Sequence, residues 1–199
     1  MFLIGSLALM GFPFLSGFYS KDLILEAAIS KYTTTGYFSY FLGSFSAFFT
    51  SFYSTRLLYL TFLSKPNGYR KIICYAMESG FFICLALALL AFFSLFVGFF
   101  SKDFIVGLGS SFFDSAIFVN KNNFTTIDAE FLNTFFKLFP VLLSLFGSFS
   151  AFFIYFNYSN LLFICKTSLL GRKIYTFLNK KWFFDKIYNE IFNQFFFKF

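Results

Sequence analysis

Charged residues are scarce in this sequence, and histidine is absent. Only 13% of the 199 residues are charged and 58% are hydrophobic, including 41 phenylalanines. An ordinary soluble domain is about 25% charged, because it must cover its surface with groups that water solvates. The composition therefore argues against a soluble protein with a phenylalanine-rich core. Because apolar runs of about 20 residues recur, it predicts an all-α integral membrane protein.

Residues that bind metals are also scarce. Cys74, Cys84 and Cys165 are far apart and odd in number, which matches neither a zinc site nor a disulfide framework. Without histidine, zinc and haem would lack their usual ligands. We interpret the cysteines as small apolar fillers and expect no metal or other cofactor on this chain.

Four apolar segments divide the chain: about 1–30 with an interruption, 38–63, 80–100 and 132–157. Each uninterrupted segment is long enough to cross a hydrocarbon core about 30 Å thick. The first 30 residues lack the basic start and the small-residue cleavage site of a signal peptide. We predict a membrane helix bundle over 1–157, whose first helix is discontinuous, followed by a tail over 158–199.

The charges of the connections indicate how the bundle is oriented. Residues 64–79 carry three basic residues against one acidic, and residues 158–199 carry seven against two. Residues 101–131 carry two basic residues against four acidic. With four crossings the two basic stretches share one side of the membrane. Because basic loops stay on the inner side, 64–79 and the tail are predicted to face the cytoplasm or the mitochondrial matrix.

The tail interleaves basic and aromatic residues in GRKIYTFLNKKWFFDKIYNEIFNQFFFKF. This pattern predicts a basic amphipathic helix along the membrane interface, with Tyr175, Trp182 and Tyr188 at headgroup depth and the basic groups toward anionic lipid. A helix packed on a partner protein fits the same pattern, and the sequence does not choose between the two.

The stretch GFPFLSGFYSKDLILE, residues 11–26, predicts a break in the first apolar segment. Pro13 lacks a backbone donor, and Gly11 and Gly17 weaken a helix on either side of it. Lipid cannot satisfy the backbone groups that a break frees. The break is therefore expected to face protein or water.

Three charged residues follow this break: Lys21, Asp22 and Glu26. A charge in mid-membrane costs about 2.5–3.5 kcal/mol on insertion scales, so an unpaired lysine there implies a use. Beside water, Lys21 could take up and release a proton, and Asp22 and the less central Glu26 could accept it. Alternatively, Lys21 extends from the helix end to the headgroups and leaves Asp22 in water.

A second copy of the SKD motif weakens the interpretation of Lys21 as a proton carrier. GFFSKDFIV at 98–106 matches GFYSKDLIL at 17–25 in six of nine positions, and it ends the third segment. Lys102 and Asp103 could be a helix-end device that satisfies free backbone groups. Arg56 is a further charged residue near a helix end. Its side chain could extend to the headgroups, or it could bind a polar partner inside the bundle. Glu78, Asp103 and Asp185 are expected to be solvated.

Four stretches carry a resemblance to a known family: GFPFLSGFYSKDLILE, FYSTRLLYLTFLSKPN, LFVGFFSKDFIVGLGSSFF and KTSLLGRKIYTFLNKKWFFDKIYNEIFN. In that order they resemble the C-terminal part of the chain 5 family of mitochondrial NADH:ubiquinone oxidoreductase (respiratory complex I). The resemblance extends over nearly the whole chain. The GFYSKD element is the most specific, although related antiporter-like subunits and cation/proton antiporters share its general form.

The resemblance implies a proton-translocating subunit at the distal end of the membrane arm. Family members contain two helices broken in mid-membrane, and the second carries the lysine of an SGF-x-SKD motif. Lys21 matches that lysine and Asp22 the adjacent acid, on a hydrated path that leads to the outer side. Lys102 and Asp103 would then belong to a helix end.

The family also implies the setting of the chain. Other complex I subunits would hold the flavin, the iron–sulfur clusters and the quinone, so that this chain performs no redox chemistry itself. Expected partners are the remaining portion of the same subunit, other membrane-arm subunits and anionic lipid, with no nucleic acid. The expected location is the mitochondrial inner membrane, crossed several times.

The sequence departs from the family in three ways. The first broken helix and its glutamate–lysine pair are absent, and residues 77–80 read MESG where the family often has HESP. The chain also stops about where the family's long lateral helix and last membrane segment would begin, so either the gene is split or this is a partial chain, and the starting Met1 favours a split gene. Two alternatives stay open: a purely structural subunit of a respiratory complex, or a piece of a cation/proton antiporter.

Overall fold

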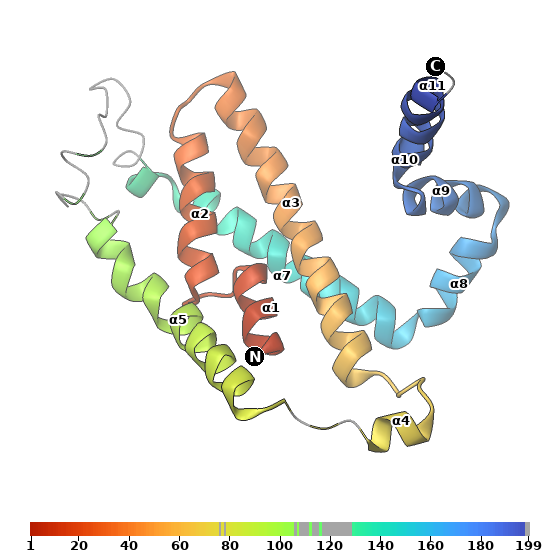
Figure 1. Ribbon diagram of the computed structural model, residues 1–199. Coiled ribbons are helices and arrows are strands. Elements are labelled where there is room, and N and C mark those ends of the chain that lie inside the picture. The colour runs from red at the N-terminus through yellow and green to blue at the C-terminus, as the bar shows by residue number, and fades with distance from the viewer. Residues whose placement is uncertain are drawn as a thin grey trace. The chain divides into compact units, whose positions relative to one another are not determined.

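The computed structural model describes residues 1–75, 77, 79–105, 107, 112, 116 and 129–197, and the regular elements of these residues are all helices. The chain divides into two compact units, Met1–Phe152 and Phe153–Phe199. The helices of the first unit are α1 (Phe2–Met10), α2 (Ser16–Ile29), α3 (Thr34–Leu58), the π-helical turn η1 (Tyr59–Leu63), α4 (Arg70–Cys74), α5 (Phe81–Ile105) and α7 (Thr134–Asn157), which continues into the second unit. In Figure 1, α1 and α2 lie between α3 and α5 and contact both of them.

Two helices in the described part of the chain, α5 and α7, are long and apolar enough to cross a membrane. On α5, Ala91 is buried while most of the phenylalanine and leucine side chains are exposed. An apolar surface of this extent requires lipid or a protein partner. Helix α3 has the same length of 25 residues, but nine of them are Ser or Thr, and it does not reach the same hydropathy.

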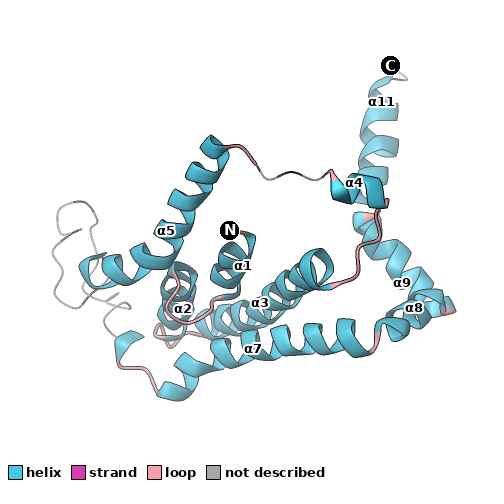
Figure 2. Cartoon of the chain, turned by 90° about the horizontal axis from the view of Figure 1, so that it is seen from below, coloured by secondary structure: helices cyan, strands magenta, loops and turns pink. Residues whose placement is uncertain are grey.

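The polar residues of α3 form part of its packing surface toward α7, which runs along it (Figure 2). Buried positions recur every three or four residues on both helices: Tyr40, Ser44, Ala47, Ser51 and Ser54 on α3, and Pro140, Ser144, Gly147 and Ala151 on α7. A side chain at Gly147 would collide with the Ser51 hydroxyl and the Phe48 carbonyl, so the two backbones are in close contact. Small residues allow such an approach between membrane helices, where packing rather than the hydrophobic effect drives association.

The contacts between helices define their directions. Along α3 and α7, Tyr40 meets Phe136, Phe48 meets Phe146 and Tyr59 meets Phe152, so these two helices run parallel. Along α2 and α3, Ala28 faces Gly36, Leu25 faces Gly43 and Lys21 bonds Thr50, so these run antiparallel. Along α2 and α5, Ser16 meets Gly98 and Tyr19 meets Phe99, so these run parallel.

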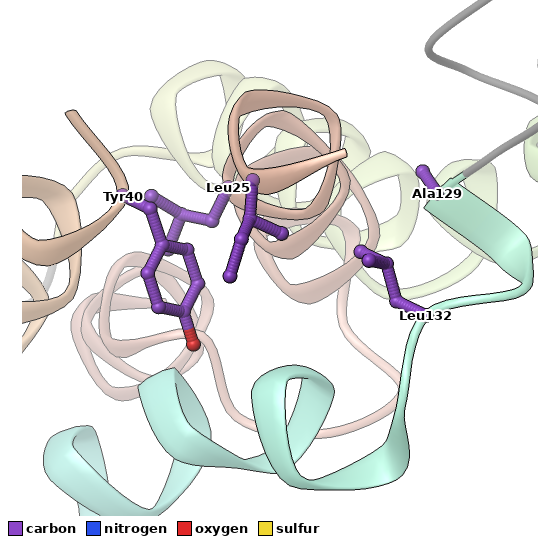
Figure 3. Close-up of a cluster of buried hydrophobic side chains, with 5 residues drawn as sticks. Leu25, Tyr40, Ala129 and Leu132 are labelled. Carbon is purple, nitrogen blue, oxygen red and sulfur yellow. The ribbon is translucent and has the colours of Figure 1, made fainter. Parts of the chain in front are cut away.

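One side chain compensates for a proline inside α7. Pro140 has no N–H, so the carbonyl four residues earlier, that of Phe136, loses its helical donor. The Tyr40 hydroxyl donates to that carbonyl over 2.7 Å, and Tyr40 is only 1% exposed. Tyr40 belongs to the buried cluster of Leu25, Ile29, Tyr40, Ala129 and Leu132, most of which Figure 3 labels. The cluster therefore joins α2, α3 and the start of α7 around a satisfied polar group.

The second unit consists of short helices. They are α8 (Ser159–Thr167), α9 (Leu169–Asn179), the 3-10 turn η3 (Lys181–Phe183), α10 (Phe184–Ile187), the π-helical turn η4 (Tyr188–Asn193) and α11 (Gln194–Phe197). Of these, α9 is strongly amphipathic, and Ser168 caps it by accepting from the Gly171 N–H over 3.2 Å.

The prediction of one amphipathic helix in the tail is therefore wrong. Ser168 separates α8 from α9 in an extended conformation. Lys181, Trp182 and Phe183 have φ between 49° and 60°, a left-handed backbone that no helix continues through. The aromatic residues predicted for the interface make local contacts: Tyr175 lies under the Lys166 amine at 4.9 Å, Trp182 lies 5.4 Å from Phe177, and Tyr188 stacks on Phe192.

Candidate functional site

The site begins where α1 ends at Gly11. Gly11 has φ +80°, its N–H bonds the Ala8 carbonyl over 3.2 Å, and the Phe12 N–H bonds the Leu7 carbonyl over 3.1 Å. This pair of bonds is a Schellman motif, which ends a helix with a left-handed residue and favours glycine there. The motif satisfies two of the four carbonyls that a helix end leaves free. The carbonyls of Leu9 and Met10 still require donors other than α1.

The chain then turns into α2 over a few residues. Phe14 has φ +72°, and the Leu15 N–H bonds the Phe12 carbonyl over 3.3 Å before α2 begins at Ser16. A side chain at Gly17 would collide with the Ala8 carbonyl, so the start of α2 lies directly against the end of α1. The interruption therefore lies inside the bundle, between two helices that are each too short to cross a membrane, at about 14 and 21 Å.

Lys21 extends from α2 back toward this interruption. Its Nζ lies 3.9 Å from the position that a Cβ on Gly11 would occupy, and it donates to Thr50 Oγ1 on α3 over 3.3 Å. The direction follows from helix geometry, because side chains on a helix lean toward its N-terminus. Thr50 donates its own proton to the Ala47 carbonyl over 2.9 Å, which leaves its oxygen free to accept from the amine.

Burial disfavours the positive charge of the Lys21 amine, whereas the carboxylate of Asp22 and the end of α1 favour it. The C-terminal end of a helix carries a partial negative charge, and α1 ends at Gly11, next to the amine. The amine is half-buried, and its level on α3 is that of Thr50, about 24 Å along the helix from Thr34. The amine therefore lies beside α3 about 24 Å from its first residue and about 12 Å from its last, where the bundle rather than bulk water surrounds it.

Asp22 points away from Lys21, because neighbouring residues on a helix are about 100° apart. Asp22 Oδ2 is fully buried, and no hydrogen-bond partner for it lies among the described residues. Buried carboxylate oxygens are normally paired, so an orphan oxygen marks a place where another group binds or a proton resides. The Lys21 amine and the Asp22 carboxylate therefore lie in different surroundings, although their charges attract each other.

Glu26 lies one turn beyond Asp22 and interacts electrostatically with Lys102 of α5 and Lys137 of α7. The Lys102 amine lies 5.9 Å from the centre of the Tyr19 ring on α2, and Lys137 donates to the Glu130 carbonyl over 2.8 Å. Charged groups from three helices therefore interact around α2. Lys21, Asp22 and Glu26 form a succession of titratable groups from the interruption toward the C-terminal end of α2.

The other charged residues singled out from the sequence lie at helix ends or outside the described residues. Lys102 and Asp103 are exposed in the last turn of α5, and Arg56 is exposed in the last turn of α3. Asp185 is exposed and pairs with Lys181 over 3.6 Å. Glu78 lies outside the described residues, as does most of the acidic connection between α5 and α7.

The described residues contain no group of three or more acidic, cysteine or histidine side chains that could hold a metal ion. Cys74, Cys84 and Cys165 are free thiols and exposed. Their interpretation as small apolar fillers stays a prediction.

Sequence reasoning missed three residues of the site. Thr50 accepts from Lys21, Lys137 interacts with Glu26, and Tyr40 supplies the donor that Pro140 removes. The small residues recurring every three or four positions on α3 could have indicated its buried side, and with it the level of Thr50. A proline in an apolar run could have indicated that its helix needs an outside donor.

Comparison with known proteins identifies curated relatives that match the chain over nearly all of its length. Over 198 residues, all of its length, the chain is 56% identical to NADH-ubiquinone oxidoreductase chain 5 of Phytophthora infestans. It is 46% identical over its whole length to the protein of the same name from Marchantia polymorpha, and 47% identical over 96% of its length to that from Acanthamoeba castellanii. The chain spans about 30% of the length of these curated relatives. No family model matches the sequence.

Proposed function

Because this chain is a homologue of NADH-ubiquinone oxidoreductase chain 5 along its full length, we propose that it is a proton-translocating, antiporter-like piece of the membrane arm of respiratory NADH:ubiquinone oxidoreductase. It moves protons through Lys21 while quinone is reduced on other subunits, which hold the flavin and the iron–sulfur clusters. Its place is the mitochondrial inner membrane, together with the remaining portion of the same subunit and other membrane-arm subunits.

The position of the Lys21 amine carries this proposal. If the lysine only anchored α2 to the headgroups, its amine would extend to the membrane surface. Instead the amine turns back to Gly11 and bonds Thr50, about 24 Å along α3. A charge held at the interruption of a membrane helix is costly unless it has a function, and it is stabilised there by the end of α1.

The directions of the helices support four crossings of the membrane. The antiparallel pair α2 and α3 and the parallel pairs α2 with α5 and α3 with α7 are those that successive crossings would produce. The hydroxyls of α3 donate to carbonyls of the same helix, as Ser44 does to Tyr40 over 2.8 Å, which lowers their cost in lipid. With the basic connections on the matrix side, Glu26, Lys102 and Lys137 share the outer end.

A route for the proton follows from this orientation. Lys21 takes a proton from a donor on the absent portion of the subunit and releases it, through Asp22, to Glu26 near the outer end. Each step is a proton transfer between groups that exist in two protonation states, so no electron moves on this chain. Burial disfavours the charged form of Glu26, and Lys137 and Lys102 partly offset this by attracting the ion that release of the proton leaves.

Replacing Lys21 with Met in the assembled complex tests the proposal. We expect normal assembly on native gels and a large loss of proton translocation, with quinone reduction slowed because the two are coupled. Lys31→Met is the matched control, since Lys31 is exposed just beyond the end of α2 and has no part in the proposed route. Unchanged pumping and reductase activity in the Lys21→Met complex would refute the proposed role of the lysine.

One contact favours a second, purely structural function. The Lys21–Thr50 hydrogen bond joins α2 to α3 and could simply hold them together. In that case Lys21→Met would lower the amount of assembled complex, and whatever complex formed would pump normally. The ratio of protons moved to electrons transferred, measured on purified complex, separates the two functions.

A further inference from the structure

The turn between α1 and α2 encloses a small cavity against α7. Its lining includes Met10, Gly11 and Pro13 from the turn and Ser144 and Ser148 from α7. The volume is about 20 Å³. Since one water molecule needs roughly 10–15 Å³ measured in this way, the cavity has room for one water.

The walls offer the hydrogen-bond partners that a water requires. The Ser144 and Ser148 hydroxyls donate to the carbonyls of Val141 and Leu145 over 2.9 and 2.8 Å, so their oxygens have lone pairs left to accept. Met10 is the last residue of α1, whose carbonyl has no intrahelical donor. A water with two to four polar partners is stable in a protein interior, whereas a purely apolar cavity stays dry.

We propose that this cavity holds one ordered water molecule, which donates one proton to the Ser144 hydroxyl oxygen and the other to the open carbonyl end of α1. The water supplies a donor to the Met10 carbonyl, which has none within α1, and stabilises the interruption in a bundle where lipid offers no hydrogen bonds. Gly11 lines the cavity and also contacts the Lys21 side chain, so the water supports the same turn that receives the amine. The use of the water in proton transfer rests on the function proposed above, but its presence does not.

A density map of the assembled complex that resolves ordered water is the direct test. We expect a water peak within hydrogen-bond distance of Ser144 Oγ and of the α1 end. A map that resolves waters elsewhere in the bundle but none in this cavity would overturn the inference.

Two variants of α7 extend the test to function. Ser144→Val fills the cavity and removes one partner, so we expect the peak to vanish and proton translocation to fall about fivefold, the effect of one hydrogen bond of ordinary strength. Ser150→Val is the matched control, because Ser150 also donates to a carbonyl three residues earlier, that of Gly147, over 2.9 Å but does not line the cavity. Equal translocation in the two variants would overturn the role of the water at the interruption.

Ser144→Ala is the alternative variant if valine does not fit at this position, and we expect it to keep the fold. It removes the hydroxyl without adding volume, and we expect a water peak weaker than in the unmodified complex. An unchanged peak would show that Ser144 does not position the water. The inference and the proposed function can fail independently. A water at this site together with normal pumping by the Lys21→Met variant would support the inference and refute the proposed function. A dry site together with a Lys21→Met variant that fails to pump would refute the inference and support the proposed function.

Discussion

The Tyr40 hydroxyl lies 2.7 Å from the Phe136 carbonyl, at the position in α7 that Pro140 deprives of a helical donor. The bond joins α3 and α7, which belong to different apolar segments of the sequence. It lies in the same cluster as Leu25 of α2. The helix that carries Lys21 and the helix that contains Thr50 are therefore packed on a core that depends on this bond.

Tyr40→Phe is expected to destabilise the bundle without changing its shape. The ring still fills its buried position, but the Phe136 carbonyl is left without a partner, at a cost of about 1–3 kcal/mol. The midpoint of thermal dissociation of the purified complex should fall. Tyr37→Phe is the control, because Tyr37 is exposed at the start of α3. Equal thermal midpoints for the two variants would contradict the importance of the bond.

Thr50→Val tests the partner of the lysine. Valine has nearly the shape of threonine but cannot accept from the amine, and a hydrogen bond to a charged group contributes about 1.5–3 kcal/mol. We expect normal assembly with slower proton translocation, and recovery in Thr50→Ser, which keeps the hydroxyl. Thr61→Val is a suitable control, since that exposed hydroxyl lies in η1 and donates to nearby carbonyls at the end of α3, those of Leu57 over 2.7 Å and Leu58 over 3.5 Å. If serine and valine at position 50 behaved alike, the bond would have no part in function.

Gly147→Ala should separate α3 from α7. The added Cβ would lie 2.5 Å from the Phe48 carbonyl oxygen, so one backbone must move, at a typical cost of about 1–3 kcal/mol. We expect less assembled complex and a lower thermal midpoint. Gly5→Ala is the comparison, since no atom lies within 4 Å of the new Cβ and alanine favours the α1 helix. Equal tolerance of the two changes would refute the close packing.

Replacement of Gly11 should depend on backbone conformation more than on side-chain size. At φ +80° a β-branched residue is strained, whereas asparagine adopts left-handed conformations more readily. We expect Gly11→Asn to assemble nearly normally and Gly11→Val to lose most of the assembled complex. Native-gel band intensities measure this difference. Similar assembly of both variants would indicate that the turn does not need its left-handed residue.

Several features of this protein follow from the sequence by itself. The scarcity of charge and the recurring apolar runs predict a helical membrane protein, because a chain with so few polar groups cannot cover a surface in water. Pro13 with its flanking glycines predicts the interruption, since it depends on local backbone chemistry. The resemblance of GFYSKD and three further stretches to chain 5 is confirmed by relatives that are 46–56% identical over the full chain.

Other features were decided by tertiary structure. A single helix pattern cannot tell whether Lys21 reaches outward or back to the interruption, because that depends on where Gly11 and Thr50 lie once α1, α2 and α3 are packed. The donor for the Phe136 carbonyl comes from 96 residues away. The tail was predicted as one helix. However, Lys181, Trp182 and Phe183 adopt a left-handed backbone that their residue types do not predict. Periodicity and composition report local preference, whereas the partners of a buried charge or carbonyl are set by which helices meet.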